Sequence, residues 1–341
     1  MYDFLQKPLQ LGSLTLRHRL VLPPMATEKA ADGRITPALI AYYREMAQGG
    51  PALVIQEHCY VAPEGKASPH QIGMDGTADM AALKELTAAV HACGVPFLAQ
   101  LSHAGSAAHR AVTGLPVVGP SAVKNPGKVA AVGGVSPDLP EALDQDGLDR
   151  IRQAFVDAAL RAKEAGYDGV EIHAAHGYLL DQFYSPLTNH RTDEYTGSTL
   201  EGRTRYLQEV CRAVRQAVGP DFVVTLRLGA ADYMPGGATV EEVPRAISLL
   251  QQAGVDGFSI SGGMSAFFRP GHTEPGYFAE LSRAAKSATA LPVMLAGGIT
   301  TGEQAERLLE EGRADLIGIA RAALKDHQIF RKIVDPVAQR S

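Results

Sequence analysis

The 341-residue sequence has no tryptophan and only three cysteines, Cys59, Cys93 and Cys211, which lie far apart in no paired motif. Three separated thiols argue against a disulfide framework and a cysteine-ligated iron–sulfur cluster, and they indicate a reducing compartment such as the cytoplasm. No uncharged apolar run approaches the roughly 18 residues of a membrane-spanning helix. The net charge of −5, with no basic patch, argues against nucleic acid as a partner.

Two glycine-rich phosphate motifs are also missing from the chain. Neither G-x-G-x-x-G nor G-x-x-x-x-G-K-[ST] occurs in the sequence. A doubly wound sheet normally carries the first motif after its opening strand, where this sequence runs into "PPMATEKA" (23–30). The absence therefore favours another α/β architecture.

Short apolar runs recur along the chain, each rich in Val, Ile and Leu and bounded by Gly, Pro or Asp. This pattern is typical of fully buried parallel strands. The runs cover residues 19–24, 52–56, 96–101, 168–173, 222–228, 256–261, 292–297 and 314–320.

Helical stretches such as 148–166 and 239–254 separate these runs, and a glycine follows each pattern. Thr239 and Glu242 have the spacing of a capping box. Strands that alternate with helices eight times predict a (β/α)8 TIM barrel, with residues 1–341 as one domain. We also expect a hairpin at 9–19 that closes the barrel floor, and a long loop at 109–147.

Polar residues cluster where the predicted strands end, which is the active face of a (β/α)8 barrel. Because the strands themselves are apolar, this segregation predicts one site at one end of the barrel. The strand-end residues are Pro24, Met25, Ala26 and Thr27, then Glu57 and His58, then Gln100 and His103, then His173, His176 and Tyr178, and finally Arg227.

Glycine-rich turns follow the last three strands, as "SGG" (261–263), "AGG" (296–298) and "GIAR" (318–321). Such turns let backbone N–H groups approach an anion, and Arg321 could add a charged contact. Each turn alone could simply be a tight connection. Three in succession with an arginine favour a phosphate-bearing ligand.

His173 and His176 stand three residues apart, and three interpretations are open. The pair could hold a metal, although no third ligand or H-E-x-x-H pattern accompanies it. The two could also be ordinary core histidines. We favour a donor pair that polarises a carbonyl or nitro oxygen, with Tyr178 nearby as a proton source, and no metal.

The segment "EIHAAHGYLLDQFYSPLTNHRTDEYTGSTLEGRTRYLQEV" (171–210) closely resembles the old yellow enzyme family of FMN-dependent ene-reductases. The likeness extends from "LTLRHRLVLPPMA" to "GRADLIGIAR" and is to the single-domain form, without the iron–sulfur segment of larger relatives. It implies a (β/α)8 barrel that binds FMN, takes hydride from NAD(P)H and reduces an activated alkene in ping-pong fashion. The implied partner is a small-molecule substrate, and the chain could form a homo-oligomer.

The resemblance also implies roles for single residues. His173 and His176 match the pair that binds the electron-withdrawing oxygen of the substrate, and Tyr178 matches the candidate proton donor. Glu28 stands where one branch of the family has a tyrosine that reaches substrate. The residues that match FMN contacts are Pro24, Met25 and Ala26 along the ring, Gln100 at its pyrimidine edge, Arg227 beside N1 and O2, and Gly262, Gly263, Gly297, Gly298, Gly318 and Arg321 at the phosphate.

Two positions depart from the family pattern. Ala26 replaces a Thr or Cys whose side chain interacts with the flavin, and whether Thr27 substitutes for it stays open. His58 replaces a small residue near the flavin, and we count it among the residues expected to bind the cofactor. Its ring could turn away, leaving only backbone near FMN, or it could take part in the site.

Other functions remain as alternatives. Amine demethylation or nitro-ester reduction would use the same FMN residues. A non-redox barrel enzyme, such as an aldolase, often needs a strand-end lysine, and no lysine lies in any of the eight predicted strands.

Overall fold

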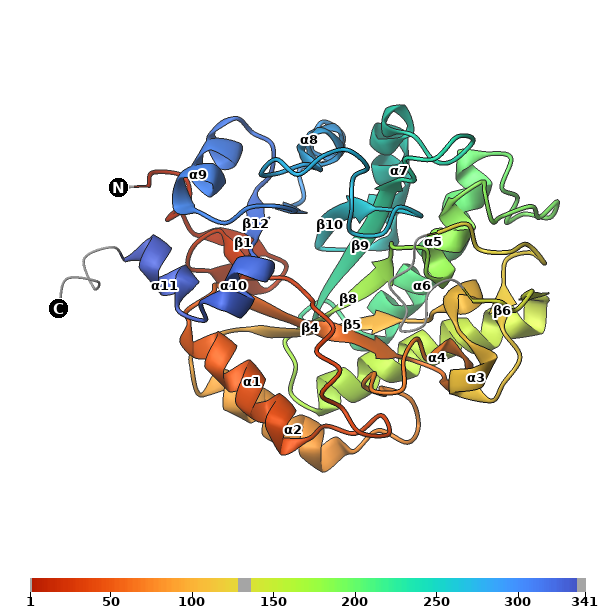
Figure 1. The fold of residues 1–341 in the computed structure, drawn as a ribbon, viewed down its shortest axis with the longest axis horizontal. Coiled ribbons are helices and arrows are strands. Elements are labelled where there is room, and N and C mark those ends of the chain that lie inside the picture. Colours follow the sequence, from red (N-terminus) through yellow and green to blue (C-terminus); the bar gives the residue numbers. More distant parts are fainter. Residues whose placement is uncertain (1, 128–135, 336–341) are drawn as a thin grey trace.

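A computed structural model describes residues 2–127 and 136–335 and shows a closed barrel of parallel strands surrounded by helices (Figure 1). Each of the eight predicted strands is present, so the (β/α)8 barrel is confirmed. Around the barrel the strands are β10 (Gly257–Gly262), β11 (Val293–Ala296), β12 (Leu316–Gly318), β3 (Leu20–Leu22), β4 (Leu53–Tyr60), β5 (Phe97–Ser102), β8 (Gly169–Ala174) and β9 (Val223–Ala231).

The five longest helices of the described residues, each of nine residues or more, begin at a side-chain cap, which explains where their connections end. Thr36, Asp79, Asp144, Thr199 and Thr301 each accept a hydrogen bond from a backbone N–H in the first turn of their helix. The α-helices are α1 (Pro37–Gln48), α2 (Met80–His91), α3 (Arg110–Thr113), α4 (Gln145–Glu164), α5 (Leu179–Tyr184), α6 (Leu200–Val218), α7 (Val243–Leu250), α8 (Ala279–Lys286), α9 (Gly302–Glu310), α10 (Arg321–Lys325) and α11 (Ile329–Val334).

The predicted helix at 239–254 is α7 with a short 3-10 turn at each end, Val240–Glu242 and Gln251–Ala253. The capping box of Thr239 and Glu242 is present. Gly254 ends the segment with φ +80°, a left-handed conformation that glycine adopts without steric cost.

One end of the barrel is closed by a hairpin of β1 (Leu9–Leu11) and β2 (Leu14–Leu16). Leu11 and Leu16 pack in a cluster with inward-facing residues at the start of the strands. The floor is therefore apolar and filled, which leaves the opposite end for chemistry. The remaining members of this cluster are Val21, Ala52, Leu53, Ile55, Leu98, Val223, Met294 and Leu316.

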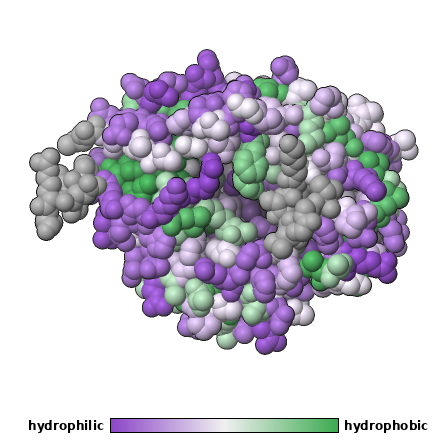
Figure 2. All heavy atoms as spheres, viewed as in Figure 1, coloured by the Kyte–Doolittle hydropathy of each residue, from purple (hydrophilic) through white to green (hydrophobic). Residues whose placement is uncertain are grey.

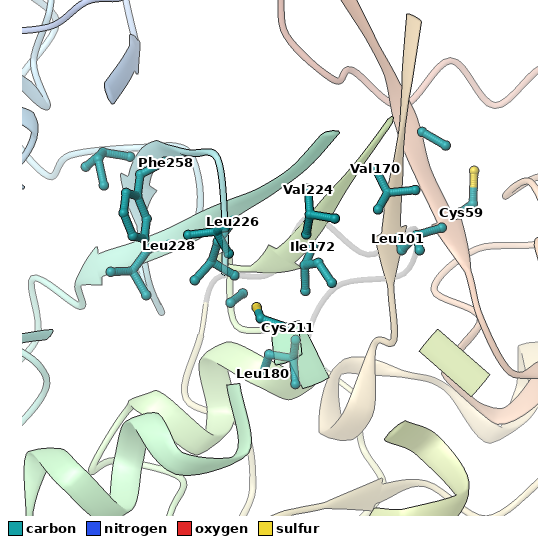
Figure 3. Packing of buried hydrophobic residues seen from close by; sticks show 14 of the residues in the cluster. Cys59, Leu101, Val170, Ile172, Leu180, Cys211, Val224, Leu226, Leu228 and Phe258 are labelled. Atoms are coloured by element: carbon teal, nitrogen blue, oxygen red, sulfur yellow. The ribbon is translucent and has the colours of Figure 1, made fainter. Parts of the chain in front are cut away.

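Alternate strand residues face outward and pack under the helices. Figure 3 shows Val170 and Ile172 of β8 beside Val224 and Leu226 of β9, with Cys211 of α6 near them. Because side chains alternate along a strand, the residues between them face the barrel interior. On these two strands the inward residues include Glu171, His173, Thr225 and Arg227.

The segment 109–147 is not one uninterrupted loop. It contains α3, and β6 (Val118–Gly119) pairs with β7 (Glu141–Ala142). Elements of two to four residues are too short to show a hydrophobic period, so no sequence pattern predicted them. Residues 128–135 of this segment lie outside the described residues.

The face seen in Figure 2 is mainly hydrophilic, with scattered apolar residues and a shaded recess near its middle. Within residues 2–127 and 136–335, no helix combines the length and apolarity needed to cross a bilayer.

Candidate active site

Four neighbouring strands bring predicted site residues together at the open end of the barrel. In the sheet register, His58 of β4 lies opposite Gln100 of β5, and His173 of β8 lies opposite Arg227 of β9. The glycine turns follow β10, β11 and β12, which adjoin β9 on its other side. Residues spread over most of the chain thus face one opening.

His173 lies near the end of β8, and His176 lies on the sharp turn that follows the strand. Their ring centroids are 5.0 Å apart, with the planes at 75°. His176 has φ +62°, an uncommon left-handed conformation for a side chain of its size, and Gly177 follows with φ +72°. Gly177 donates its N–H to Oδ2 of Asp181 at 2.7 Å, and its carbonyl accepts from Asn125 and Gln182. These bonds hold the turn that places the His176 ring beside that of His173.

Both imidazoles are held neutral. Burial lowers the pKa of His173 well below 6.5, and the charges of neighbouring His176 and Arg227 add to the effect. Burial and Arg227 lower the pKa of His176 in the same direction. Nε2 of His176 lies 2.7 Å from Oγ of Ser261, whereas Nδ1 of His173 has no partner among the described residues. A neutral imidazole carries one N–H, so each ring can donate to a ligand oxygen.

Tyr178 stands beside the pair, with its ring centroid 5.1 Å from that of His173. The residue is 5% exposed, and burial together with the charge of Glu28 raises the pKa of its phenol. The phenol therefore keeps its proton at neutral pH and can donate it. Glu28 itself is exposed, has φ +54° and accepts from Oγ of Ser68 at 2.8 Å.

A polar network fills the barrel just below the histidines. Nε2 of Gln100 donates to Oε1 of Glu171 at 2.7 Å, and Oγ of Ser259 donates to the other carboxylate oxygen. Burial raises the pKa of Glu171, and the Arg227 guanidinium opposes that shift. Arg227 is 6% exposed, and its Nε and Nη1 have no partner among the described residues.

Glu171 was missed by the sequence reasoning, although a signal was present. It lies inside the apolar run "DGVEIH", two residues before His173 and therefore on the same face of the strand. A charged residue at such a position needs compensation, which here comes from the hydrogen bonds of Gln100 and Ser259 and from the charge of Arg227.

The glycine turns have little room for side chains. A Cβ on Gly297 or Gly298 would lie 2.8 Å from the Tyr277 ring or 2.9 Å from the carbonyl of Glu274, and both glycines have positive φ. A Cβ on Gly318 would lie 2.9 Å from that of Ala296. At Gly262 and Gly263 it would collide with the Ala266 carbonyl and with Oδ1 of Asp232. Glycine is thus required at all five positions.

Tyr277 interacts electrostatically with both Arg227 and Arg321, and the sequence reasoning missed it as well. Burial raises its pKa, while the charges of Arg321 and Arg227 lower it. The Tyr277 hydroxyl donates to the carbonyl of Phe267 at 2.9 Å. Its position in a loop without a motif offered no signal.

In the segment after β3, Thr27 turns its side chain toward Glu57. Its backbone N–H and its hydroxyl both donate to the Glu57 carboxylate, at 2.8 and 2.7 Å. The hydroxyl is therefore engaged inside the protein. Ala26 is exposed and Pro24 and Met25 are half-buried, so these three line the open end.

An exposed aromatic pair lies at the edge of the site. Phe267 and Phe268 are 41% and 51% exposed, with centroids 4.2 Å apart. The Phe267 ring is 6.2 Å from that of His176. The pair gives the opening an apolar edge beside the donor histidines. No cluster of three or more His, Cys, Asp and Glu that could hold a metal occurs within the described parts of the chain.

The donor set fits FMN. Arg227 offers two buried, unpartnered guanidinium nitrogens for an electron-rich ring edge, and Gln100 lies next to it across the shared Glu171. The side-chain-free turns and Arg321 suit a phosphate. Pro24, Met25 and Ala26 would line the ring. The sheet register brings Gln100, His173 and Arg227 together, the other assigned residues follow strands at the same end of the barrel, and all these roles stay predictions.

Comparisons with known proteins agree with this site. The family model described as "NADH:flavin oxidoreductase / NADH oxidase family" matches residues 4–339. An NADH oxidase of Thermoanaerobacter brockii is 38% identical over 95% of this chain and 49% of its own length. An NADPH dehydrogenase of Halalkalibacterium halodurans is 35% identical over 92% of this chain and 88% of its own.

Among solved structures, the old yellow enzyme homologue of Zymomonas mobilis superimposes with a TM-score of 0.85 at 28% identity, covering 98% of this chain and 93% of that one. The chain spans about half the length of the first two curated relatives, at 49% and 48%.

Proposed function

The chain belongs to the NADH:flavin oxidoreductase / NADH oxidase family, the old yellow enzyme family, and we propose that it reduces activated alkenes with NAD(P)H. The substrates would be α,β-unsaturated carbonyl or nitro compounds. In the overall reaction, one alkene, one NAD(P)H and one proton give the saturated product and NAD(P)+. Bound FMN would supply the hydride relay, accepting hydride from NAD(P)H and delivering it to the β-carbon of the alkene.

The observation that carries the proposal is the pair of neutral imidazoles, His173 and His176, 5.0 Å apart at the mouth of the barrel. As hydride reaches the β-carbon, negative charge develops on the carbonyl or nitro oxygen. Two N–H donors fixed around that oxygen stabilise the transition state more than the ground state. The turn through His176 and Gly177 keeps the donors in place before the substrate arrives.

The remaining residues support this chemistry. Tyr178 keeps its proton and lies next to His173, so it can protonate the α-carbon. Arg227 keeps a positive charge inside the barrel, where the electron-rich edge of the cofactor would lie. The apolar edge formed by Phe267 and Phe268 favours substrates with a hydrophobic body.

The test is anaerobic turnover of the purified protein with NADPH or NADH and cyclohexenone. We expect one cyclohexanone for each NAD(P)H oxidised, together with a flavin absorbance band that copurifies with the protein. Parallel reactions distinguish the related flavin reactions: a nitrate ester with NAD(P)H as reductant, and a tertiary amine with an artificial electron acceptor in place of NAD(P)H. Turnover of either, with no cyclohexanone formed, would replace the proposal by demethylation or nitro-ester reduction.

A further inference from the structure

A β-bulge in β4 turns His58 toward the barrel interior. The register pairs Gln56 with Ala99 and then His58 with Gln100, so Glu57 is the extra residue. Ile55 packs with the hairpin residues at the barrel floor and so faces inward, whereas Ala99 packs under the helices and faces outward. Because side chains alternate along a strand, Gln100 and its partner His58 face the barrel interior. Without the bulge, Glu57 would face inward and His58 would face the helices. The predicted strand at 52–56 ended before this residue, whereas β4 continues to Tyr60.

Gln71 determines which ring nitrogen of His58 carries the proton. Its Oε1 accepts the N–H of Ala67 at 2.6 Å, which fixes the orientation of the amide. The amide nitrogen then lies 2.6 Å from Nδ1 of His58 and also donates to the His58 carbonyl and to Ser102. An amide NH2 only donates, so Nδ1 must be the acceptor and the ring proton must lie on Nε2. Burial lowers the pKa of His58 to about 4, so the ring is neutral at physiological pH.

The Nε2 edge of His58 belongs to the same opening as the histidine pair. The ring centroid is 5.5 Å from that of Tyr178 and 6.3 Å from that of His173. His58 keeps partial exposure, although its neighbours His173 and Tyr178 are 3% and 5% exposed. No acceptor for Nε2–H is found among the described residues. The Nε2–H of His58 can therefore donate to a ligand that binds in this opening.

We propose that His58 is a third imidazole donor of the site, fixed by Gln71 as the Nε2–H tautomer, and that it donates to a carbonyl oxygen of the bound ligand. The carbonyl can be that of the FMN ring or that of the unsaturated substrate, and only the second rests on the proposed function. In either case the site has this donor because residue 58 is a histidine.

The tautomer is tested without turnover. Two-bond 15N–1H spectra of the 15N-histidine-labelled holoenzyme, with His58 assigned by the signals lost in His58→Ala, should show Nδ1 as the unprotonated nitrogen from pH 8 to pH 5. Gln71→Glu replaces the donor by an acceptor, so we expect the proton to appear on Nδ1. A parent spectrum with Nδ1–H, or with a charged ring at pH 6, would overturn the assignment.

Ligand binding tests the donor role, with two arms. Equilibrium dialysis gives the Kd of FMN, and titration of the oxidised holoenzyme gives the Kd of cyclohexenone. His58→Ala should raise one of them about five- to tenfold, consistent with one neutral hydrogen bond, and the arm that responds identifies the acceptor. Gln71→Glu should raise the same Kd although His58 remains.

The matched control is His70→Ala, which removes an exposed histidine whose Nδ1 lies 3.3 Å from the Ala30 carbonyl. It should leave both constants unchanged. Unchanged constants in His58→Ala, with the tautomer as expected, would reject the donor role. If the protein fails to reduce any alkene, the proposed function fails, while the tautomer and the FMN arm are still decided.

Discussion

Nε2 of Gln100 donates to Oε1 of Glu171 at 2.7 Å inside the barrel, next to the Arg227 guanidinium. The carboxylate therefore does two things for the site. It orients the amide that the family resemblance assigns to the flavin, and it compensates a buried positive charge. A change at Glu171 is therefore expected to affect both Gln100 and Arg227, which face the open end of the barrel.

Glu171→Gln should destabilise the protein by about 3 kcal/mol, because it leaves the buried Arg227 charge uncompensated. Thermal and denaturant unfolding of parent and variant without FMN measure the loss. In the double variant Glu171→Gln with Arg227→Gln, the loss should be smaller than the sum of the single losses. Additive losses would mean that the two side chains do not interact.

Arg321→Ala should weaken FMN binding about tenfold, since it removes one charge-assisted contact at a partly solvated phosphate. Equilibrium dialysis of the cofactor-free protein against FMN measures the change. Arg307→Ala, an exposed arginine on α9, is the control and should bind FMN as the parent does. Equal Kd values in Arg321→Ala and the parent would place Arg321 away from the phosphate.

Ala26→Thr and Ala26→Cys should shift the midpoint potential of the bound flavin. Ala26 lines the open end and offers no side-chain hydrogen bond, and the Thr27 hydroxyl next to it is engaged by Glu57 at 2.7 Å. A new hydroxyl or thiol would thus be the first such donor at this place. Spectroelectrochemical titration measures the potential, and identical values in all three proteins would show that position 26 does not reach the ring.

The sequence predicted the barrel because its eight strands are fully buried and their apolar runs are continuous. It predicted His173, His176, Tyr178, Gln100 and Arg227 for the reason that strand ends collect polar groups. What it did not predict depends on register. The bulge at Glu57 shifts the alternation of β4 by one residue, and only the observed pairing shows that His58 faces inward.

Long-range contacts account for the other omissions. Tyr277 lies in a loop without periodicity, and its electrostatic interaction with Arg227 and Arg321 follows from how β9, β10, β11 and β12 are arranged in the barrel. The orientation of Gln71, which fixes the His58 tautomer, depends on a backbone N–H four residues away. Neither contact has a pattern that could be read along the chain.

Asp181 should make the protein less stable as the pH rises. Burial and the charge of Asp232 raise the pKa of Asp181 well above 3.8 in the folded state. Between about pH 4 and that raised pKa the folded chain binds more protons than the unfolded chain, so the free energy of unfolding falls as the pH rises. A difference of one between the folded and unfolded pKa corresponds to about 1.4 kcal/mol in the free energy of unfolding.

Asp181→Asn removes this titration and can still accept from the Gly177 N–H through its amide oxygen. We therefore expect the melting temperature of the variant to fall less than that of the parent as the pH rises from 5 to 8. Asp149→Asn, on the exposed side of α4, should follow the parent. Parallel curves for the parent and Asp181→Asn would show that Asp181 ionises normally.

The histidine pair gives the most direct test of the proposed chemistry. His173→Ala and His176→Ala should each slow the oxidative half-reaction with cyclohexenone by about 10²–10³, the usual loss for one oxyanion donor. Flavin reduction by NAD(P)H should depend on the pair far less, because no oxygen of the nicotinamide gains comparable charge. Tyr178→Phe should slow the oxidative half-reaction more modestly, since water can supply the proton.

Stopped-flow absorbance separates the two half-reactions, and their ratio is what distinguishes a donor role from a structural one. The His176 turn carries a left-handed backbone at φ +62°, so His176→Asn, a residue that tolerates this conformation and keeps an N–H donor, should retain more of the oxidative rate than His176→Ala. Equal losses in both half-reactions, with no recovery in His176→Asn, would indicate general damage to the turn. Unchanged rates in both alanine variants would mean that His173 and His176 are core residues, and the alkene reduction proposed here would lose its supporting observation.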